Sequence, residues 1–294
     1  MEDQTKCEPG PLNAPVEHLQ DLLKLEDVSR SFLMNDGTTF FALKGLSLSV
    51  QNIKDKPQII SLLGPSGSGK TTALRLIAGL DRPTSGTITI AGGENHPLRP
   101  VRVGDVGVVF QRYPLFEDLN VLDNLVVPAT RSGLTTQAAK AKAAHYLNEF
   151  DLVKQGLSWP VQLSGGQRQR VAILQQLMLE RHFIILDEPF SGLDPVNINS
   201  VIKLIYHIAH EHTLNTFIII THDVTSALMI SDHVYLIGRE RNAQGEPQNG
   251  GRVIKAYDLI AEGIAYQRDI TEIEELPRFA ALRKEIKLIE FPKL

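Results

Sequence analysis

The sequence predicts an α/β fold with a largely parallel sheet, an N-terminal antiparallel β-subdomain and an inserted α-helical subdomain. Three observations predict it. Two strand-like segments flank a turn near the N-terminus. Short apolar segments typical of buried strands then alternate with segments of helical periodicity, which favours parallel strand pairing. The strand signal stops between Gln111 and Leu179 and returns afterwards, which is the pattern of a helical insert inside an α/β domain.

Length and composition narrow the class of protein. The 294 residues suffice for one large domain, or for one domain with a small appendage. Hydrophobic residues make up 43% and charged residues 22%, as in ordinary soluble globular proteins. The net charge of -4 offers no basic field, so we expect no nucleic-acid partner. The apolar runs are shorter than the about 20 residues of a membrane helix, and the single cysteine, Cys7, fits a reducing cytosol.

The N-terminal residues predict a flexible leader followed by a β-hairpin. Residues 1–22 combine prolines with polar residues and show no periodic pattern. Segments 23–28 and 40–50 have strand composition and flank a turn at Asn35-Asp36-Gly37. We therefore expect the folded domain to begin at residue 23.

A phosphate-binding loop follows the next predicted strand, residues 58–63. It matches the pattern G-x-x-x-x-G-K-[ST] and comprises Gly64, Pro65, Ser66, Gly67, Ser68, Gly69, Lys70 and Thr71, with Thr72 beside it. Glycines let backbone N–H groups turn toward phosphate oxygens. Lys70 supplies a positive charge to the β- and γ-phosphates, and Thr71 offers a hydroxyl to Mg²⁺. A helix over 71–79 adds its positive dipole end. This combination predicts a P-loop NTPase core.

The middle of the chain predicts the insert and the rest of the sheet. Strands are expected at 87–90 and 106–110, followed by a helical subdomain over about 112–179. Within it, residues 136–150 are alanine-rich and helical, and Ser164 caps a helix from about Gly165 to Leu179. Strand patterns return at 182–186, 217–221 and 233–237, and a helix with apolar residues at helical spacing separates the first two.

The C-terminal part predicts a short extension. A polar loop or hairpin turn follows Gly238, so we assign residues 23–240 to the main domain and 241–294 to the extension. Residues 277–290 predict an amphipathic helix with an apolar stripe of Phe279, Leu282, Ile286 and Ile289. The stripe fits two alternatives, a surface for a partner or second copy and a helix packed on its own domain.

Two carboxylates, Asp187 and Glu188, end the strand at 182–186. Because neighbouring residues of a strand point to opposite faces, the two can have different tasks. Asp187 can hold Mg²⁺ through water, and Glu188 can act as the base that polarises attacking water. The pair gains its meaning from the phosphate-binding loop upstream.

The segment Leu163-Ser164-Gly165-Gly166-Gln167 lies between that loop and the carboxylates. With these three motifs in this order, the chain resembles the ATP-binding subunit of an ABC (ATP-binding cassette) transporter over about residues 24–240. The resemblance implies ATP and Mg²⁺ as cofactors, with Thr71, Gln111 and Asp187 at the metal. It also implies a catalytic set of Glu188, His222, Gln111 and Lys70, with Asp194 in a loop at the dimer interface and Phe32 stacking on adenine. Phe40 and Phe41 are weaker candidates for the stacking ring.

The resemblance further implies that Ser164, Gly165, Gly166 and Gln167 contact the nucleotide of a second copy, so ATP joins two chains. Partners are then transmembrane permease subunits and a solute-binding protein, and the chain is cytoplasmic and peripheral on the inner face of the membrane. Tyr113, Pro114, Leu115 and Phe116 are candidates for the permease contact. Residues 174–177, Leu-Gln-Gln-Leu, depart from the family pattern by lacking a basic residue.

The residues around the phosphate-binding loop resemble importer ATPases of the nitrate/sulfonate/taurine class, which implies uptake of a small solute, with an anion as one option. Alternatives are the ATPase of a bacterial exporter or lipid-trafficking system, a soluble ABC ATPase acting on ribosomes or DNA, and a nucleotide-binding regulatory subunit without turnover.

Overall fold

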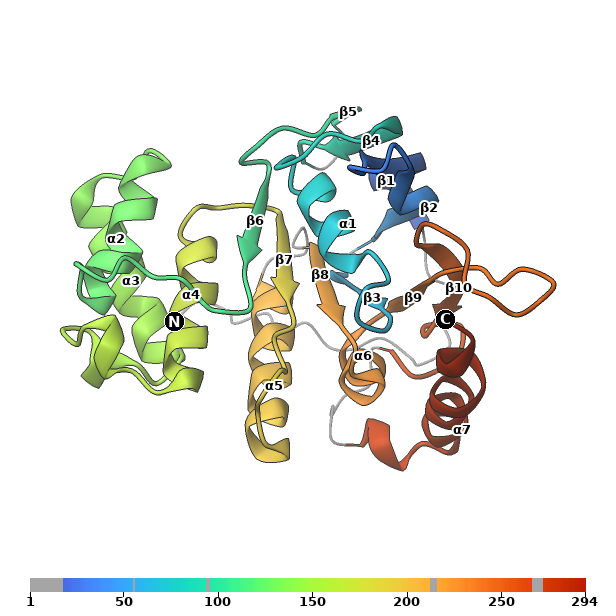
Figure 1. Ribbon diagram of the computed structural model, residues 1–294. Coiled ribbons are helices and arrows are strands. Elements are labelled where there is room, and N and C mark those ends of the chain that lie inside the picture. Colours follow the sequence, from blue (N-terminus) through green and yellow to red (C-terminus); the bar gives the residue numbers. More distant parts are fainter. Residues whose placement is uncertain (1–17, 55, 94–95, 212–215, 266–271) are drawn as a thin grey trace.

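A computed structural model describes residues 18–54, 56–93, 96–211, 216–265 and 272–294. Two sheets and a group of helices make up the molecule (Figure 1). The α-helical insert lies on one side of a central six-stranded sheet, and a four-stranded antiparallel sheet lies on the other. The predicted fold class is confirmed. Cys7 and the first 17 residues of the predicted leader lie outside the described residues.

The antiparallel sheet has the strand order β2-β1-β4-β5, over β1 His18–Leu33, β2 Thr39–Ile53, β4 Ser85–Ala91 and β5 Leu98–Pro100. The first strand begins at His18, so the predicted leader boundary at residue 22 is too late. Register shifts along the pairing of β1 with β2 interrupt the alternation of apolar and polar residues. The sequence pattern therefore showed only the parts of each strand that alternate regularly.

The six-stranded sheet has the order β10-β9-β3-β8-β7-β6, over β3 Gln58–Leu63, β6 Val106–Val109, β7 Phe183–Asp187, β8 Thr216–Thr221, β9 His233–Gly238 and β10 Arg252–Asp258. Its pairs are parallel except β9 with β10. The sheet thus continues past the predicted domain end at residue 240. Strand β10 was missed because it is an edge strand whose polar residues break the apolar run.

Alternate residues of the central strands enter two different cores. Ile59 of β3 and Ile219 of β8 pack on one face against helices, while Ile60 and Ile218 pack on the other against helix α1, Lys70–Ile77, and the antiparallel sheet. All six residues of β3 and of β8 are buried. Strands covered on both faces have continuous apolar sequences, which explains why the sequence located them well.

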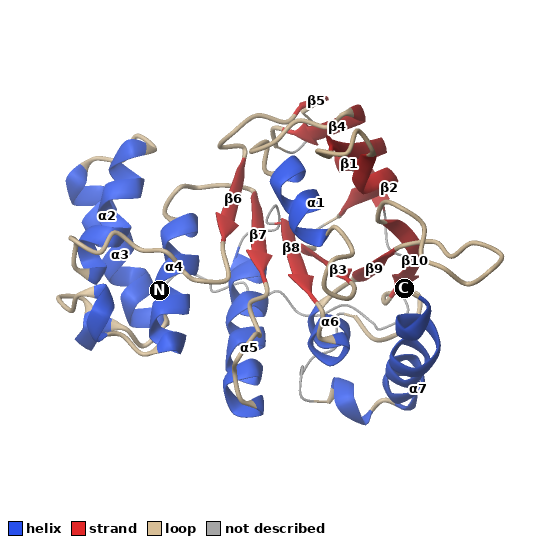
Figure 2. Ribbon diagram, in the orientation of Figure 1, coloured by secondary structure: helices blue, strands red, loops and turns tan. Residues whose placement is uncertain are grey.

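Helices cover both faces (Figure 2). Helix α1, Lys70–Ile77, lies between the two sheets, while α5 Pro195–Glu211 and α6 Val224–Ile230 cover the opposite face. The insert contains α2 Val121–Arg131, α3 Thr136–Glu149 and α4 Gly165–Leu177, with short 3-10 turns at Val153–Gln155 and Pro160–Gln162. In the described part of the chain, no helix has the length and apolar character to cross a membrane.

The C-terminal helix packs on its own domain. It comprises α7, Pro277–Glu285, continued by a π-helical turn over Ile286–Glu290 and a 3-10 turn over Phe291–Lys293, after a 3-10 turn at Ile273–Glu275. Phe279, Leu282 and Ile286 are fully buried in the core under the sheet. Ile289 is 51% exposed and does not belong to that buried stripe. Of the two alternatives, the structure supports packing within the chain for the first three residues.

Candidate nucleotide-binding site

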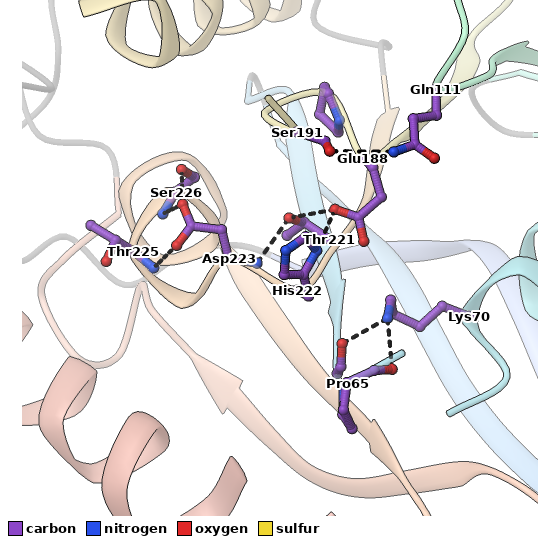
Figure 3. Close-up of polar contacts among 12 residues, drawn as sticks. Pro65, Lys70, Gln111, Glu188, Ser191, Thr221, His222, Asp223, Thr225 and Ser226 are labelled. Atoms are coloured by element: carbon purple, nitrogen blue, oxygen red, sulfur yellow. Dashed lines mark hydrogen bonds and ion pairs between the residues drawn. The ribbon is translucent and has the colours of Figure 1, made fainter. Parts of the chain in front are cut away.

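The phosphate-binding loop and the ends of β7 and β8 surround one cavity of about 500 Å³. Parallel strands bring their carboxyl ends to the same edge of the sheet, so residues distant in sequence meet there. Figure 3 shows Lys70, Gln111, Glu188 and His222 around this space. The lining residues are Phe40, Ala42, Ser66, Gly67, Gly69, Lys70, Thr71, Thr72, Gln111, Asp187, Glu188, Ile220 and His222.

The loop needs its glycines for packing as well as for an approach to phosphate. Gly69 has φ 99°, and a Cβ there would lie 2.7 Å from the carbonyl oxygen of Ala42. A Cβ on Gly64 would lie 2.1 Å from the carbonyl oxygen of Ile237. Gly67, with φ 80°, lines the cavity, and a Cβ there would meet no described atom within 4 Å. The loop is therefore held against β9 at Gly64 and against β2 at Gly69, while Gly67 between them is open toward the cavity.

Lys70 is held inside the loop. Its Nζ donates hydrogen bonds to the carbonyl oxygens of Gly64 and Pro65, at 2.6 and 2.9 Å (Figure 3). Burial lowers the pKa of Lys70 below its ordinary value, and the nearby carboxylates Glu188 and Asp187 only partly offset this lowering. The side chain is only 7% exposed, so its rotamer is largely fixed before any ligand arrives.

Asp187 and Glu188 line the same cavity, although strand geometry alone would send them to opposite faces. Strand β7 ends at Asp187, and Glu188 adopts φ 49°, a left-handed conformation that turns its side chain back toward the cavity. Its N–H donates to the carbonyl oxygen of Ile220 at 2.8 Å, which holds this turn. Burial, and next the charge of Glu188, raises the pKa of Asp187. Two carboxylates this close favour a bound cation.

His222 and Thr221 fix the Glu188 carboxylate from the neighbouring strand. The Nδ1 atom of His222 lies 2.8 Å from Oε2 of Glu188, and the hydroxyl of Thr221 donates to the same oxygen at 3.3 Å (Figure 3). Both residues sit where β8 ends. The carboxylate is thereby aimed into the cavity by groups that the sequence separates by more than thirty positions.

Gln111 reaches the cavity from the end of β6 and the start of the insert. Its Nε2 donates to the hydroxyl of Ser191 at 3.3 Å, so the insert contacts the loop that follows the two carboxylates. Gln111, Thr71 and Asp187 all line this cavity. An amide, a hydroxyl and a carboxylate supply oxygen atoms, the ligands that Mg²⁺ accepts alongside water and phosphate. These three residues therefore fit the predicted metal, and the loop geometry fits a polyphosphate.

The glycine-rich segment after Leu163 lies in a different cavity. This cavity, of about 630 Å³, lies between α3, α4 and α5, and its lining shares no residue with that of the first. Ser164, Gly165, Gly166 and Gln167 line it together with Asp194. Ser164 caps α4 because its hydroxyl oxygen accepts a hydrogen bond from the N–H of Gln167 at 3.3 Å, and the side-chain oxygen of Gln167 accepts one from the N–H of Ser164 at 3.0 Å. One chain therefore does not bring this segment to its own phosphate-binding loop.

Asp194 stands at the start of α5 in the same second cavity. Its Oδ1 accepts hydrogen bonds from the N–H groups of Val196 and Asn197, at 3.0 and 3.1 Å. These bonds satisfy two free donors at the helix N-terminus. In this chain the residue is thus a helix cap as well as a cavity residue.

Of the aromatic candidates, Phe40 lines the first cavity and Phe32 does not. The two are cross-strand partners on β1 and β2 and so share a face. Phe32 is 43% exposed, with the guanidinium carbon of Arg30 4.8 Å from its ring centre. The candidate ranked lower from the sequence is thus the one at the cavity wall.

Sequence reasoning missed Arg239, which lies beside this wall. Its guanidinium carbon is 5.8 Å from the ring centre of Phe40, and its Nη2 donates to the carbonyl oxygen of Gly67 at 3.3 Å. Arg239 belongs to a polar loop with no motif and is 172 positions from Gly67. No local sequence pattern could have indicated the contact.

The candidate permease contact divides between core and surface. Leu115 is 8% exposed and belongs to the core, and Tyr113 is partly buried with its hydroxyl donating to the carbonyl oxygen of Pro189 at 3.4 Å. Pro114 is exposed, and Phe116 is 48% exposed. Two of the four residues therefore have a packing role in this chain.

Comparison with known proteins gives a consistent result. A family model described as ABC transporter matches residues 43–191. The chain is 38% identical to a Fe(3+) ions import ATP-binding protein of Rhizobium meliloti (strain 1021), over 71% of this chain and 57% of that protein. It is 39% identical to a sulfate/thiosulfate import ATP-binding protein of Brucella melitensis biotype 1, over 74% of this chain and 59% of that protein. It thus spans less than two thirds of the length of these relatives.

Among solved structures, the chain is similar to a dimeric ATP-binding cassette in a post-hydrolysis state, bound to ADP and Pi. The TM-score is 0.64 at 28% sequence identity, covering 81% of this chain and 99% of that one.

Proposed function

Because the chain belongs to the ABC transporter family, we propose that it is the ATP-hydrolysing motor subunit of a membrane transporter whose permease is a separate chain. The observation that supports this proposal best is the division of the motifs between two cavities. The loop, the carboxylates and His222 share one cavity, and the glycine-rich segment lies in the other. A complete site then requires two chains.

The first cavity binds the triphosphate of ATP. Backbone N–H groups of the loop and the N-terminus of α1 face the phosphate oxygens. Lys70 transfers its Nζ hydrogen bonds from the carbonyls of Gly64 and Pro65 to the β- and γ-phosphates, and Phe40 borders the space next to the loop. Thr71, Gln111 and Asp187 would hold Mg²⁺, which would supply positive charge to offset that of the phosphates.

Glu188 is the base of the hydrolysis step. Its carboxylate polarises a water molecule, whose oxygen attacks the γ-phosphorus as the bond to the β–γ bridging oxygen breaks, leaving ADP and phosphate. Glu188 takes the proton of the water. His222 and Thr221 orient the carboxylate through the contacts at 2.8 and 3.3 Å, so the base is held in place before ATP binds.

The second cavity completes the site of another copy. Ser164 and the N–H groups of Gly165 and Gly166 lie at the N-terminus of α4, where a helix favours an anion. In a dimer related by a two-fold axis, this segment caps the γ-phosphate bound to the other chain. ATP then holds two chains together, and hydrolysis releases them. This cycle drives the permease.

The transported solute and the other partners follow from analogy rather than from the site. The relatives named above are ferric iron and sulfate/thiosulfate import proteins, which favours import of a small ionic solute over the narrower nitrate/sulfonate/taurine class. Import implies a permease, a solute-binding protein and a position on the cytoplasmic face of the membrane. Pro114 and Phe116, at the start of the insert, are the two of the four candidates that are exposed and so accessible for the permease contact.

The test of the ATPase proposal is Glu188→Gln. This variant keeps the hydrogen-bonding shape of the side chain but removes the base, so we expect ATP binding without turnover and a trapped dimer with Mg·ATP. Size-exclusion chromatography coupled to light scattering reads out the dimer, and Glu274→Gln, an exposed change outside both cavities, is the matched control. A Glu188→Gln chain that hydrolyses ATP at the wild-type rate contradicts the assignment.

The transporter proposal has its own test. Purification of the tagged chain from gently solubilised membranes should recover a polytopic permease together with a solute-binding protein. A permease without a binding protein would indicate an exporter or lipid-trafficking system. Recovery of ribosomal or DNA-repair proteins would indicate a soluble ABC ATPase.

A further inference from the structure

The hairpin that joins β9 to β10, residues 239–251, is attached to the wall of the nucleotide cavity. The side chain of Asn249 accepts a hydrogen bond from the N–H of Phe41 and donates one to the carbonyl oxygen of Thr39, at 3.0 and 3.1 Å. Gly251 exchanges two backbone hydrogen bonds of 3.0 Å with Ala42 and Lys44. The hairpin therefore extends the edge of β2 beside Phe40.

The same hairpin touches the phosphate-binding loop. A Cβ on Gly251 would lie 1.9 Å from the carbonyl oxygen of Ser68, so the two backbones are in direct contact. Gly250 has φ 99°, and a Cβ there would lie 2.5 Å from the Cβ of Lys44. The end of the hairpin is thus fixed against both the loop and β2, which restricts where its first residue, Arg239, can lie.

Arg239 brings a positive charge to the mouth of the cavity. It is half-buried, its Nη2 donates to the carbonyl oxygen of Gly67, and its guanidinium faces the ring of Phe40. The cavity lining itself carries one lysine, Lys70, against two carboxylates, Asp187 and Glu188. A nucleotide with several negative charges would gain from a second cation at this mouth.

We propose that Arg239 is a nucleotide-binding residue that contacts the phosphate groups nearest the sugar. This proposal rests on the proposed function and deepens it. The guanidinium has five N–H donors in a planar fork that matches phosphate oxygens. Gly67 and Phe40, which Arg239 contacts, both line the cavity. A small rotation about its side chain therefore moves it from the Gly67 carbonyl to a bound phosphate without rearrangement of the hairpin.

The hairpin offers a matched control in Arg241. This exposed arginine donates to the carbonyl oxygens of Lys293, Gly245 and Pro292, so its contacts involve the hairpin and the C-terminal turn and not the cavity. Arg239→Gln and Arg241→Gln remove the same charge from the same segment. Arg239→Gln also keeps an N–H donor for Gly67, so a role as a structural clip is largely preserved.

The experiment measures binding of ADP, AMP and adenosine to each purified full-length chain, with the thermal unfolding midpoint without nucleotide. For Arg239→Gln we expect the Kd of ADP and AMP to rise about tenfold, with adenosine binding and the unfolding midpoint unchanged. In turnover the KM for ATP should rise while kcat stays near wild type. Arg241→Gln should match wild type in every binding measurement.

Equal Kd values for ADP in wild type and Arg239→Gln overturn the proposal. A lower unfolding midpoint, together with an equal loss of affinity for adenosine and for ADP, also overturns the proposal, because that result assigns Arg239 a structural role. Failure of the proposed function gives a different result. In that case the wild-type chain itself binds no ADP, and Lys70→Ala, which removes the loop cation, leaves every binding measurement unchanged.

Discussion

The contact between Gly251 and the phosphate-binding loop provides a quantitative test of how the C-terminal hairpin supports the site. Gly251→Ala adds one methyl group, which would lie 1.9 Å from the carbonyl oxygen of Ser68 and 3.4 Å from that of Ala42. An ordinary carbon–oxygen contact is not this short, so about 1.5 Å of separation between the hairpin and the loop must be gained. The atom that the methyl group would meet belongs to the backbone of Ser68, and a Cβ has no torsion that could move it away, so no side-chain rotation relieves the clash.

The expected cost follows from the hydrogen bonds at this point. The bonds from Gly251 to Ala42 and from Lys44 to Gly251 are each 3.0 Å long and are not retained after such a shift. Loss of two backbone hydrogen bonds, at about 0.5–1.5 kcal/mol each, lowers the free energy of unfolding by about 1–3 kcal/mol. Displacement of Ser68 also misplaces the phosphate-binding N–H groups, which is expected to slow ATP hydrolysis about 10- to 100-fold.

Denaturant unfolding and steady-state ATP hydrolysis measure the two effects on the same sample. Gly92→Ala is the matched control, because among the described residues a Cβ there meets only the Cβ of His96 at 4.0 Å. It should change neither quantity. A Gly251→Ala chain that loses stability but hydrolyses ATP at the wild-type rate would refute the reasoning, since the hairpin alone would then have moved.

Two further predictions concern the C-terminal helix and the acidic residues. Phe279→Ala should lower the free energy of unfolding by about 3–5 kcal/mol, because the ring is fully buried in the chain's own core. Ile289→Ala, at an exposed position, should have little effect. An unfolding free energy that depends on protein concentration would instead indicate an intermolecular contact. Burial raises the pKa of Asp187, so the folded chain binds a proton there more tightly than the unfolded chain and the charged form opposes folding. Asp187→Asn should therefore raise the unfolding midpoint at pH 7 without nucleotide, and the gain should shrink as pH falls through the raised pKa and vanish below the ordinary value of about 3.9. A higher unfolding midpoint of Asp187→Asn that persists at pH 3 would contradict the raised pKa of Asp187 as its cause.

Much of the fold was predictable because its central strands are buried on both faces. Strands β3, β7 and β8 have largely apolar sequences, so their positions could be predicted. Because the three strands are parallel, their carboxyl ends bring the phosphate-binding loop, Asp187 and Thr221 to one edge of the sheet. Edge strands and strands with irregular register were harder to predict from the sequence. Strand β10 has polar residues through its length, and β1 changes register along its pairing with β2, so neither shows a uniform period.

The rest of the site depended on backbone geometry and distant contacts. Glu188 has a left-handed φ, which turns its side chain into the same cavity as Asp187. A glutamate in the sequence does not indicate this backbone conformation. The contact of Arg239 with Gly67 spans 172 positions, and that of Gly251 with Ser68 arises from the same hairpin. The sequence indicated the residues that we propose for the chemistry, but it could not place the residues that hold them.

The central claim is that each ATP site is built from two chains, and mixing two inactive variants tests it most directly. Lys70→Ala removes the loop cation, and Ser164→Arg blocks the second cavity, so each variant alone lacks any complete site. In an equal mixture half of the dimers combine both variants and contain one intact site of two, so hydrolysis should recover to about one quarter of the wild-type rate. A mixture no more active than the sum of the separate variants would contradict a shared site.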